Sequence, residues 1–498
     1  MTHPSKNRAS RPKYVSQHQL VIEGFESPFE KSLNPNNRWV RLAKLLPWDE
    51  LASIYRKHFP EKLTGRPSLS PRLVLGAIII KHMCNLDDRE TVDQISENIY
   101  MQYFLGYSSF SDTPPFDPSL FVEFRKRLGL TQINAINERI LKIKRNADKE
   151  QDSNDSSDDQ SGSTHKGSLL VDATACPQDI AYPTDLNLLN DAREKSEELL
   201  DIVYAFSTLE IKPRNYREKA RKEYLRTAQK KRRTYKEIRA AIRKQLGYLR
   251  RNIRSIERIL DTLSQIPFNK QQYKYWFVIQ HLYTQQKLLY DTKTKSVDHR
   301  IVSIHQPHVR PIVRGKTNAK VEFGAKINVA LVDGFSFLDD MSWEAYNEGT
   351  RLIDCVEKYR RRFGHYPQSV LADKIYCTRH NRAYLKEKQI KLKAKPLGRP
   401  PKKALSNQVS PGERNPIEGK FGQAKTAYGL NRVRARLSNT SESWIASIIL
   451  VLNLVNLAEV AHYWLKFIKF VMDEIKNLRE KKNYQRQLKY QFLTRNAA

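Results

Sequence analysis

The chain has 498 residues, about three times the usual length of a domain, so two or three domains with a sizeable core are expected. Lysine and arginine number 87 against 54 acidic residues, and the net charge of +33 favours a polyanionic partner, with nucleic acid as the leading candidate. The chain begins without an apolar leader, and its four cysteines show no paired metal or redox spacing, so we expect a reducing cytoplasm. The apolar stretch 444–461 contains Asn453, Asn456 and Glu459, which are costly in a bilayer, and it therefore predicts a buried helix rather than a membrane span.

The N-terminal part of the chain is expected to be helical. Residues 1–40 are rich in Pro, Asn, Ser and basic residues without periodicity, which indicates a flexible basic arm. Residues 41–147 contain apolar residues at helical spacing in three segments, which begin after Pro71, at Asp88 and after Pro118. Three short helices suit a DNA-binding domain related to helix-turn-helix modules. An ordinary helical bundle is the alternative, because helical spacing alone identifies no DNA groove.

A mixed α/β core is expected after an acidic, serine-rich linker at residues 148–167. The core comprises two segments, 168–204 and 301–465. A short apolar strand ends on Asp172, an alternating strand begins at Val321, and Asp333-Gly334 predicts a tight hairpin. A later strand ends on Asp373. This order predicts an α+β or α/β fold with a mixed sheet.

Residues 205–300 interrupt this alternation and predict an inserted basic helical hairpin. Residues 212–258 contain 19 basic and 4 acidic residues, a net charge of +15, and their apolar residues recur at spacings of four and three. The sequence Ile266-Pro267 breaks the pattern before a second apolar stripe. The concentration of charge favours contact with DNA phosphates over a merely solvated helix face.

Three acidic residues occupy positions suited to a two-metal nuclease site. Asp172 and Asp373 lie at strand ends and Glu418 lies in a helix, so the three carboxylates can converge on a pair of divalent cations. Cleavage of a phosphodiester develops charge on the attacking and leaving oxygens, and two Mg²⁺ ions stabilise both. Because Mg²⁺ prefers oxygen ligands and needs only a few carboxylates, we expect these three residues to be catalytic ligands of Mg²⁺, for which Mn²⁺ can substitute.

The segment around Glu418 has a second interpretation. Asn415 can cap a helix in which Pro416 is the first residue, and Glu418 then completes a capping box without any role in catalysis. Spacing alone leaves both interpretations open. A catalytic role is favoured by Arg414 just before the predicted helix and by Lys425 two turns after Glu418, because such residues can hold the scissile phosphate and its neighbours.

These residues resemble those of bacterial insertion-sequence transposases of the DDE type, in the large group with a Tyr, Arg, Glu, Lys signature. Arg414, Glu418 and Lys425 match the signature with three and six residues between them, whereas Pro411 stands at the tyrosine position. Short stretches at 171–174, 310–316, 322–326 and 372–376 are also similar to this group. The resemblance covers about residues 65–460.

The resemblance implies an RNase H-like catalytic core, Mg²⁺-dependent cleavage at the ends of a mobile element and integration elsewhere. It also implies an N-terminal domain that reads terminal inverted repeats, and a homodimer in the synaptic complex. The expected partner is double-stranded DNA, both element ends and target, at the nucleoid in the bacterial cytoplasm.

Other basic residues are candidates for DNA contact. Lys420 lies on the same predicted helix as Arg414 and Lys425. Arg66 and Arg399 each lie in a Gly-Arg-Pro sequence that can enter an A·T-rich minor groove, with a flexible loop as the alternative. Residues 466–498 predict a basic helical tail that is solvated or packs in a dimer.

The predicted function is therefore a DNA transposase. The main alternative is a catalytically silent relative that acts as a DNA-binding regulator, and the loss of an acid would mark it. A repair nuclease would share the active site, but it would cut DNA without joining it.

Overall fold

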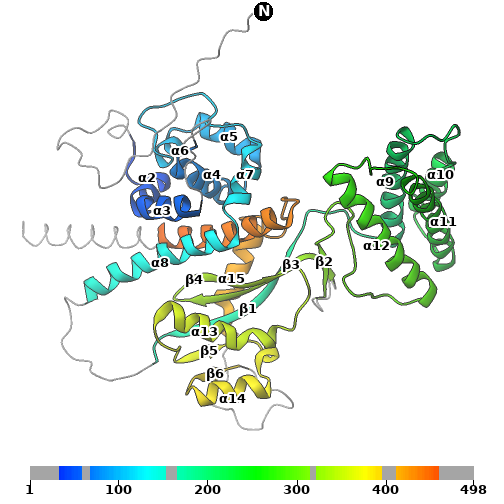
Figure 1. Ribbon diagram of the computed structural model, residues 1–498. Helices are drawn as coiled ribbons and strands as arrows, with labels where there is room; N and C mark the ends of the chain where they lie inside the picture. Colours follow the sequence, from blue (N-terminus) through cyan, green and yellow to red (C-terminus); the bar gives the residue numbers. More distant parts are fainter. Residues whose placement is uncertain (1–32, 59–67, 153–164, 314–320, 395–410, 459–498) are drawn as a thin grey trace, which may run out of the picture. The chain divides into compact units, whose positions relative to one another are not determined.

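The computed structural model describes residues 33–58, 68–152, 165–313, 321–394 and 411–458 (Figure 1). The chain divides into two compact units: residues 1–160, 332–337 and 447–498 form the first, and residues 161–331 and 338–446 form the second. Most of the expected arm, the whole of the expected tail, Arg66 and Arg399 lie outside the described residues.

The first unit is helical, as predicted. Helix α4 lies at its centre, because 12 of its 13 residues are buried. The expected segment from Asp88 is interrupted at Asn98, whose side chain caps the next helix. The last helix continues five residues into the expected linker. The helices are α2 (Arg38–Leu45), α3 (Trp48–His58), α4 (Pro71–Met83), α5 (Asp88–Glu97), α6 (Ile99–Phe104), α7 (Leu120–Arg127) and α8 (Leu130–Asp152).

One carboxylate connects the three helices that the sequence predicts for DNA binding. Asp88 at the start of α5 forms ion pairs with Lys81 of α4 at 2.9 Å and with Arg125 of α7 at 2.8 Å. The side chains of Lys81 and Arg125 are buried, with exposed fractions of 1% and 6%. Buried charges of this kind need their partner, so Asp88 fixes how α4, α5 and α7 pack together.

The second unit contains a mixed sheet, which confirms the predicted class of fold. Strand β3 lies between β2 and β1 and also pairs with β4, and β1 continues the sheet through β5 to β6. Strand β3 is antiparallel to β1, whereas β5 is parallel to β1 and β6 is parallel to β5. The strands are β1 (Ser168–Pro177), β2 (Arg310–Val313), β3 (Val321–Val332), β4 (Phe335–Ser342), β5 (Ser369–Leu371) and β6 (Lys391–Lys393).

The predicted hairpin is present between β3 and β4. Asp333 and Gly334 have φ values of 49° and 80°, the left-handed conformations that a two-residue hairpin turn requires at both positions. Glycine adopts such a conformation without a steric penalty.

Helices accompany the strands of this sheet. Helices α13 and α15 contact β1, and α14 contacts β6. The helix Ser438–Ala458 is long and apolar enough to span a membrane, but 83% of its apolar window is buried, as expected for a core helix. The other elements are η1 (Glu348–Arg351), α13 (Leu352–Phe363), η2 (Lys374–Tyr376), α14 (Arg379–Glu387) and α15 (Pro411–Thr426).

The insertion has more helices than the predicted hairpin. The two expected helices correspond to α11 (Tyr235–Leu260) and α12 (Lys270–Thr292), but α10 (Arg217–Ala228) is a separate helix. Helix α9 (Asp185–Ala205), which the sequence assigned mainly to the catalytic segment 168–204, shares one hydrophobic cluster with α11 and α12. In packing terms the insertion therefore begins at the start of α9. The local sequence of α9 does not indicate which elements cover its apolar face.

Gly324 permits the close approach of β3 to the end of β1. A β-carbon at this position would lie 2.0 Å from the carbonyl oxygen of Cys176, which is backbone and cannot move away alone. We expect Gly324→Ala to destabilise the sheet by about 1–3 kcal/mol, as overpacking usually does. The measurement is the urea denaturation midpoint. Gly247→Ala is the control, because a β-carbon there has open space. Equal midpoints for wild type and Gly324→Ala would show that β1 and β3 are less closely packed than described.

Candidate active site

The two predicted aspartates lie next to each other, Asp172 on β1 and Asp373 after the end of the parallel neighbour β5. Leu170 of β1 pairs with Leu371 of β5, so the positions two residues further along the two chains, Asp172 and Asp373, are also neighbours. The strand that was expected to end on Asp172 continues to Pro177, because its second half pairs with β3, so Asp172 lies within β1 opposite Val329. Asp373 follows the end of β5. The parallel pairing of β1 with β5 thus brings together two carboxylates that are 201 residues apart.

Backbone donors and one arginine hold the two carboxylates. Oδ1 of Asp172 accepts a hydrogen bond of 2.8 Å from its neighbour's N–H, and Oδ1 of Asp373 accepts one of 2.7 Å from the N–H of Lys374. The guanidinium of Arg414 forms ion pairs with both, at 3.2 Å to Oδ2 of Asp172 and 3.5 Å to Oδ1 of Asp373. A single cationic group therefore bridges the pair.

Glu418 lies on α15, one helical turn after Arg414. The helix begins at Pro411, so Pro416 is inside it and Glu418 is in its second turn. This position excludes the capping-box interpretation, which required a helix that starts at Pro416. Among the described residues, Glu418 has no hydrogen-bond or ion-pair partner, and its side chain is exposed.

A cavity of about 880 Å³ joins these residues. Asp172, Asp373 and Glu418 line it together, and the basic side chains of Arg414 and Lys425 line it from the helix. All three predicted acids therefore face one space. Lys420 is half-buried on the same helix but does not line the cavity.

The cavity contains a fourth acid that the sequence analysis missed. Glu348, at the start of η1, lines the cavity and forms a 2.8 Å ion pair with Lys326 of β3. Lys326 also donates a 3.0 Å hydrogen bond to the carbonyl of Tyr346. No sequence signal marked Glu348, because it precedes a helix without any motif and reaches Asp172 only through the fold.

The environment of Asp172 disfavours its charge. Its side chain is only 17% exposed, and burial raises its pKa from 3.8 to about 6, with a further contribution from the carboxylates of Glu348 and Asp373. The Ala173 N–H and Arg414 act in the opposite direction. A buried carboxylate with acidic neighbours and insufficient positive charge is suited to binding a cation.

The raised pKa predicts a specific dependence of stability on pH in metal-free protein. Because the folded-state pKa of Asp172 is above its unfolded value, Asp172 lowers stability progressively as pH rises from about 4 to 6, by up to about 3 kcal/mol. Asp172→Asn lacks this effect. In EDTA, the variant should therefore be more stable than wild type above pH 6, and the difference should shrink towards pH 4. Urea denaturation at several pH values measures it, and a difference that does not change with pH would contradict the assigned environment.

The carboxylate oxygens of the site suit a hard divalent cation, although the described side chains do not surround a single metal position. Carboxylate oxygens are the ligands that Mg²⁺ prefers. Within the part of the chain that the structure describes, no group of three or more His, Cys, Asp or Glu side chains converges closely enough to hold a metal ion. Asp172 and Asp373 are adjacent, and Arg414 provides the positive charge between them.

Carboxylates that share one cavity are suited to metal-ion catalysis, which nucleases, polymerases, phosphatases and aminopeptidases use. Residues 27–127 match the family model described as "Transposase domain (DUF772)", and residues 370–455 match the model "Transposase DDE domain". The second match includes Asp373 and Glu418. The chain belongs to the insertion-sequence DDE transposases, which confirms the resemblance stated above. Transposases act on DNA, and DDE domains generally use divalent metals.

A curated relative is similar to part of the chain. "Uncharacterized protein ORF8 in nfe locus" from Rhizobium meliloti is 32% identical over 167 residues, which are 33% of this chain and 73% of that protein. No solved structure matches the chain at a significant level.

Proposed function

We propose that the protein moves an insertion sequence: it binds the terminal inverted repeats, cleaves the DNA ends by two-metal phosphodiester hydrolysis and joins them to target DNA by 3′-hydroxyl strand transfer. The observation that carries this proposal is the convergence on one cavity of Asp172 and Asp373, adjacent across β1 and β5, with Glu418 of α15. Three carboxylates and a bridging arginine in one cavity provide both cation ligands and a phosphate-binding group.

The order of the strands supports an RNase H-like core. The hairpin β3–β4 is antiparallel to the central strand β1 on one side, and β5 and β6 extend the sheet in parallel on the other. Helices α13 and α14 follow β4 and β5 in the chain. In this arrangement the two aspartates lie on the central strand and its parallel neighbour.

Asp172, Asp373 and Glu418 would hold Mg²⁺, with Mn²⁺ as a substitute. The bound ions would stabilise the charge that develops on the attacking and leaving oxygens. Arg414, released from the carboxylate pair, would bind a phosphate of the substrate through its guanidinium. Lys425 faces the same cavity and would contact a neighbouring phosphate, and we assign a similar role to Lys420 on the same helix.

Three further parts of the proposal concern DNA contact and assembly of the complex. The helical unit that contains α4, α5 and α7 would bind the terminal repeats, and two copies of the chain would form the synaptic complex. Arg66 and Arg399 remain proposed DNA contacts.

The experiment is incubation of the purified protein with a labelled duplex that carries the terminal repeat, together with a supercoiled target, in Mg²⁺ and in EDTA. Nicked, excised and joined products are separated on a gel. The proposal predicts joined products in Mg²⁺ alone. Tight binding without cleavage would instead support a DNA-binding regulator, and cleavage without joining would support a nuclease.

A further inference from the structure

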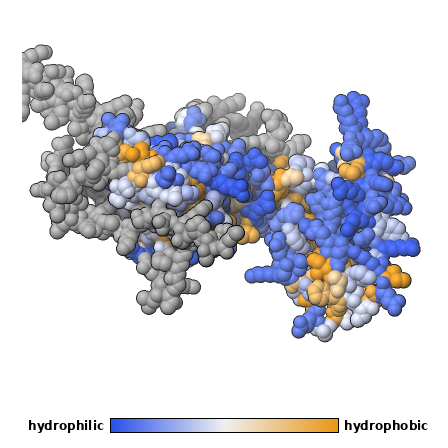
Figure 2. Space-filling model, turned by 90° about the horizontal axis from the view of Figure 1, so that it is seen from above, coloured by the Kyte–Doolittle hydropathy of each residue, from blue (hydrophilic) through white to orange (hydrophobic). Residues whose placement is uncertain are grey.

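The insertion carries a continuous basic surface that has no role in the active site. Of the 19 basic residues in 212–258, only Lys212, Arg217, Lys230 and Lys244 form ion pairs within the described part of the chain. Hydrophilic side chains cover most of the visible face of the insertion (Figure 2). Charge that is not neutralised within the protein is available for an external polyanion.

Five of these residues form a stripe along α11, defined here as Lys236, Arg243, Arg250, Arg254 and Arg258. At 100° per residue they lie within an arc of about 80°, and at 1.5 Å per residue they extend over about 33 Å. All five side chains are exposed, and none has an ion-pair or hydrogen-bond partner among the described residues. The opposite face of α11 packs into the core of the insertion through Leu249, Ile253 and Ile256. The helix is therefore held by its apolar face and presents its basic face outward.

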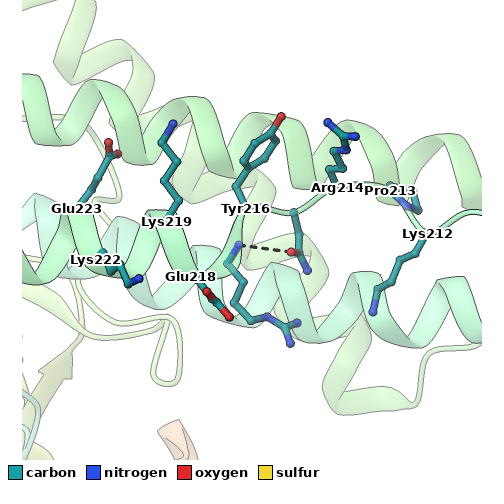
Figure 3. Close-up of a pocket in the computed structure, with 10 residues that line it drawn as sticks. Lys212, Pro213, Arg214, Tyr216, Glu218, Lys219, Lys222 and Glu223 are labelled. Atoms are coloured by element: carbon teal, nitrogen blue, oxygen red, sulfur yellow. Dashed lines mark hydrogen bonds between the residues drawn. The ribbon is translucent and has the colours of Figure 1, made fainter.

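A basic cavity adjoins the stripe where the chain enters α10. Its volume is about 810 Å³, and Arg214, Lys219 and Lys222 extend from the loop and from α10 around it (Figure 3). The guanidinium of Arg251, which follows Arg250 of the stripe in the chain, lies 4.5 Å from the ring centre of Tyr216. The stripe and the cavity thus meet at Arg251.

Tyr216 is held in an unfavourable conformation at this cavity. Its φ is 51°, in the left-handed region that aromatic residues rarely adopt, and its side chain is 40% exposed. Such strain is retained where the position of a side chain is functionally constrained. Here it places an aromatic ring against the guanidinium of Arg251, between Arg250 and Arg254 of the stripe. Glu218 and Glu223 also line the cavity and are its acidic residues.

We propose that the stripe and this cavity form a second DNA-binding surface, which binds the phosphate backbone of duplex DNA without reading its sequence. The length of the stripe is close to one turn of B-DNA, about 34 Å. Its side chains are lysine and arginine without accompanying asparagine or glutamine, so it offers point charges and guanidinium groups for phosphates rather than paired amides for base edges. Gly247 lies within the same arc, with open space where a β-carbon would be, so the backbone of the helix is accessible at the middle of the stripe.

The test compares two full-length variants that lose equal charge from the same insertion. The stripe variant combines Arg243→Gln, Arg250→Gln, Arg254→Gln and Arg258→Gln. The control variant combines Lys270→Gln, Lys274→Gln, Lys293→Gln and Lys295→Gln, which are exposed residues of α12 and the loop that follows it. Binding to a 30-base-pair random duplex and to a terminal-repeat duplex is measured in EDTA over a range of salt concentrations. Because no metal is present, the result does not depend on the proposed catalytic function.

The stripe variant should lose about 3–4 units from the slope of log K against log salt for both duplexes, at about 0.9 per phosphate contact. Its affinity should fall at least tenfold, and the slope of the control variant should change by less than about one. An unchanged slope in the stripe variant, or equal losses in both variants, would overturn the proposal. A loss confined to the terminal repeat would show a sequence-reading surface instead. Matching melting temperatures ensure that both variants are folded.

Discussion

Replacement of Asp172 by Asn is expected to lower DNA cleavage and joining by about 10³-fold while binding to terminal repeats stays within about twofold. A metal ion contributes several kcal/mol to stabilisation of the transition state, and about 1.4 kcal/mol corresponds to a factor of ten. The substitution removes one negative charge from the cavity and none of the positive charge that attracts DNA. Single-turnover assays with a labelled duplex, alongside a filter-binding or gel-shift measurement, give both quantities.

Asp179→Asn is the matched control for this prediction. Asp179 lies two residues after the end of β1 and forms a 3.0 Å ion pair with Arg432, but it does not line the cavity. Its substitution should leave cleavage nearly unchanged. If Asp172→Asn abolished binding together with cleavage, Asp172 would have a structural role, and the proposed assignment would be wrong.

Glu418→Gln should reduce cleavage by a similar factor, although Glu418 contacts neither aspartate. Glu418 lines the same cavity as both, and a neutral amide is a weaker ligand for a divalent cation than a carboxylate. Glu413→Gln tests the specificity of the effect, because Glu413 lies on the same helix, is exposed and, among the described residues, forms only a 3.4 Å ion pair with Lys393.

The two glutamates separate a catalytic role from a helix-stability role. If both variants lose activity equally, the effect arises from α15 as a whole and not from a third metal ligand. If Glu418→Gln retains full activity, the third acid must be sought elsewhere in the cavity, where Glu348 is the remaining carboxylate.

The positions of Asp172 and Asp373 were predictable from the sequence, because short apolar runs mark the strands. Asp172 lies in an apolar run and Asp373 ends one, and parallel pairing of such strands places their ends together. The hairpin at Asp333-Gly334 was also predictable, since its turn residues mark it.

The start of α15 and the fourth acid were not predictable in the same way. Asn415-Pro416 is typical of a helix start, but Pro411 precedes it and the helix accommodates Pro416 in its interior. Glu348 approaches Asp172 through the packing of η1 against η2 and α13 and through its ion pair with Lys326 of β3, and the periodicity of the sequence does not indicate such contacts. The packing of α9 with α11 and α12 likewise depends on contacts between residues that are far apart in the sequence.

The most direct test of the central claim is the location of the bound cation. Protein loaded with Fe²⁺ in place of Mg²⁺ and treated with ascorbate and peroxide is cleaved by radicals close to the metal, and mass spectrometry identifies the cut peptide bonds. We predict cuts near residues 172, 373 and 418, which excess Mg²⁺ suppresses and which Asp172→Asn weakens. Cuts elsewhere, or cuts at these positions that Mg²⁺ does not suppress, would contradict a catalytic metal site in this cavity.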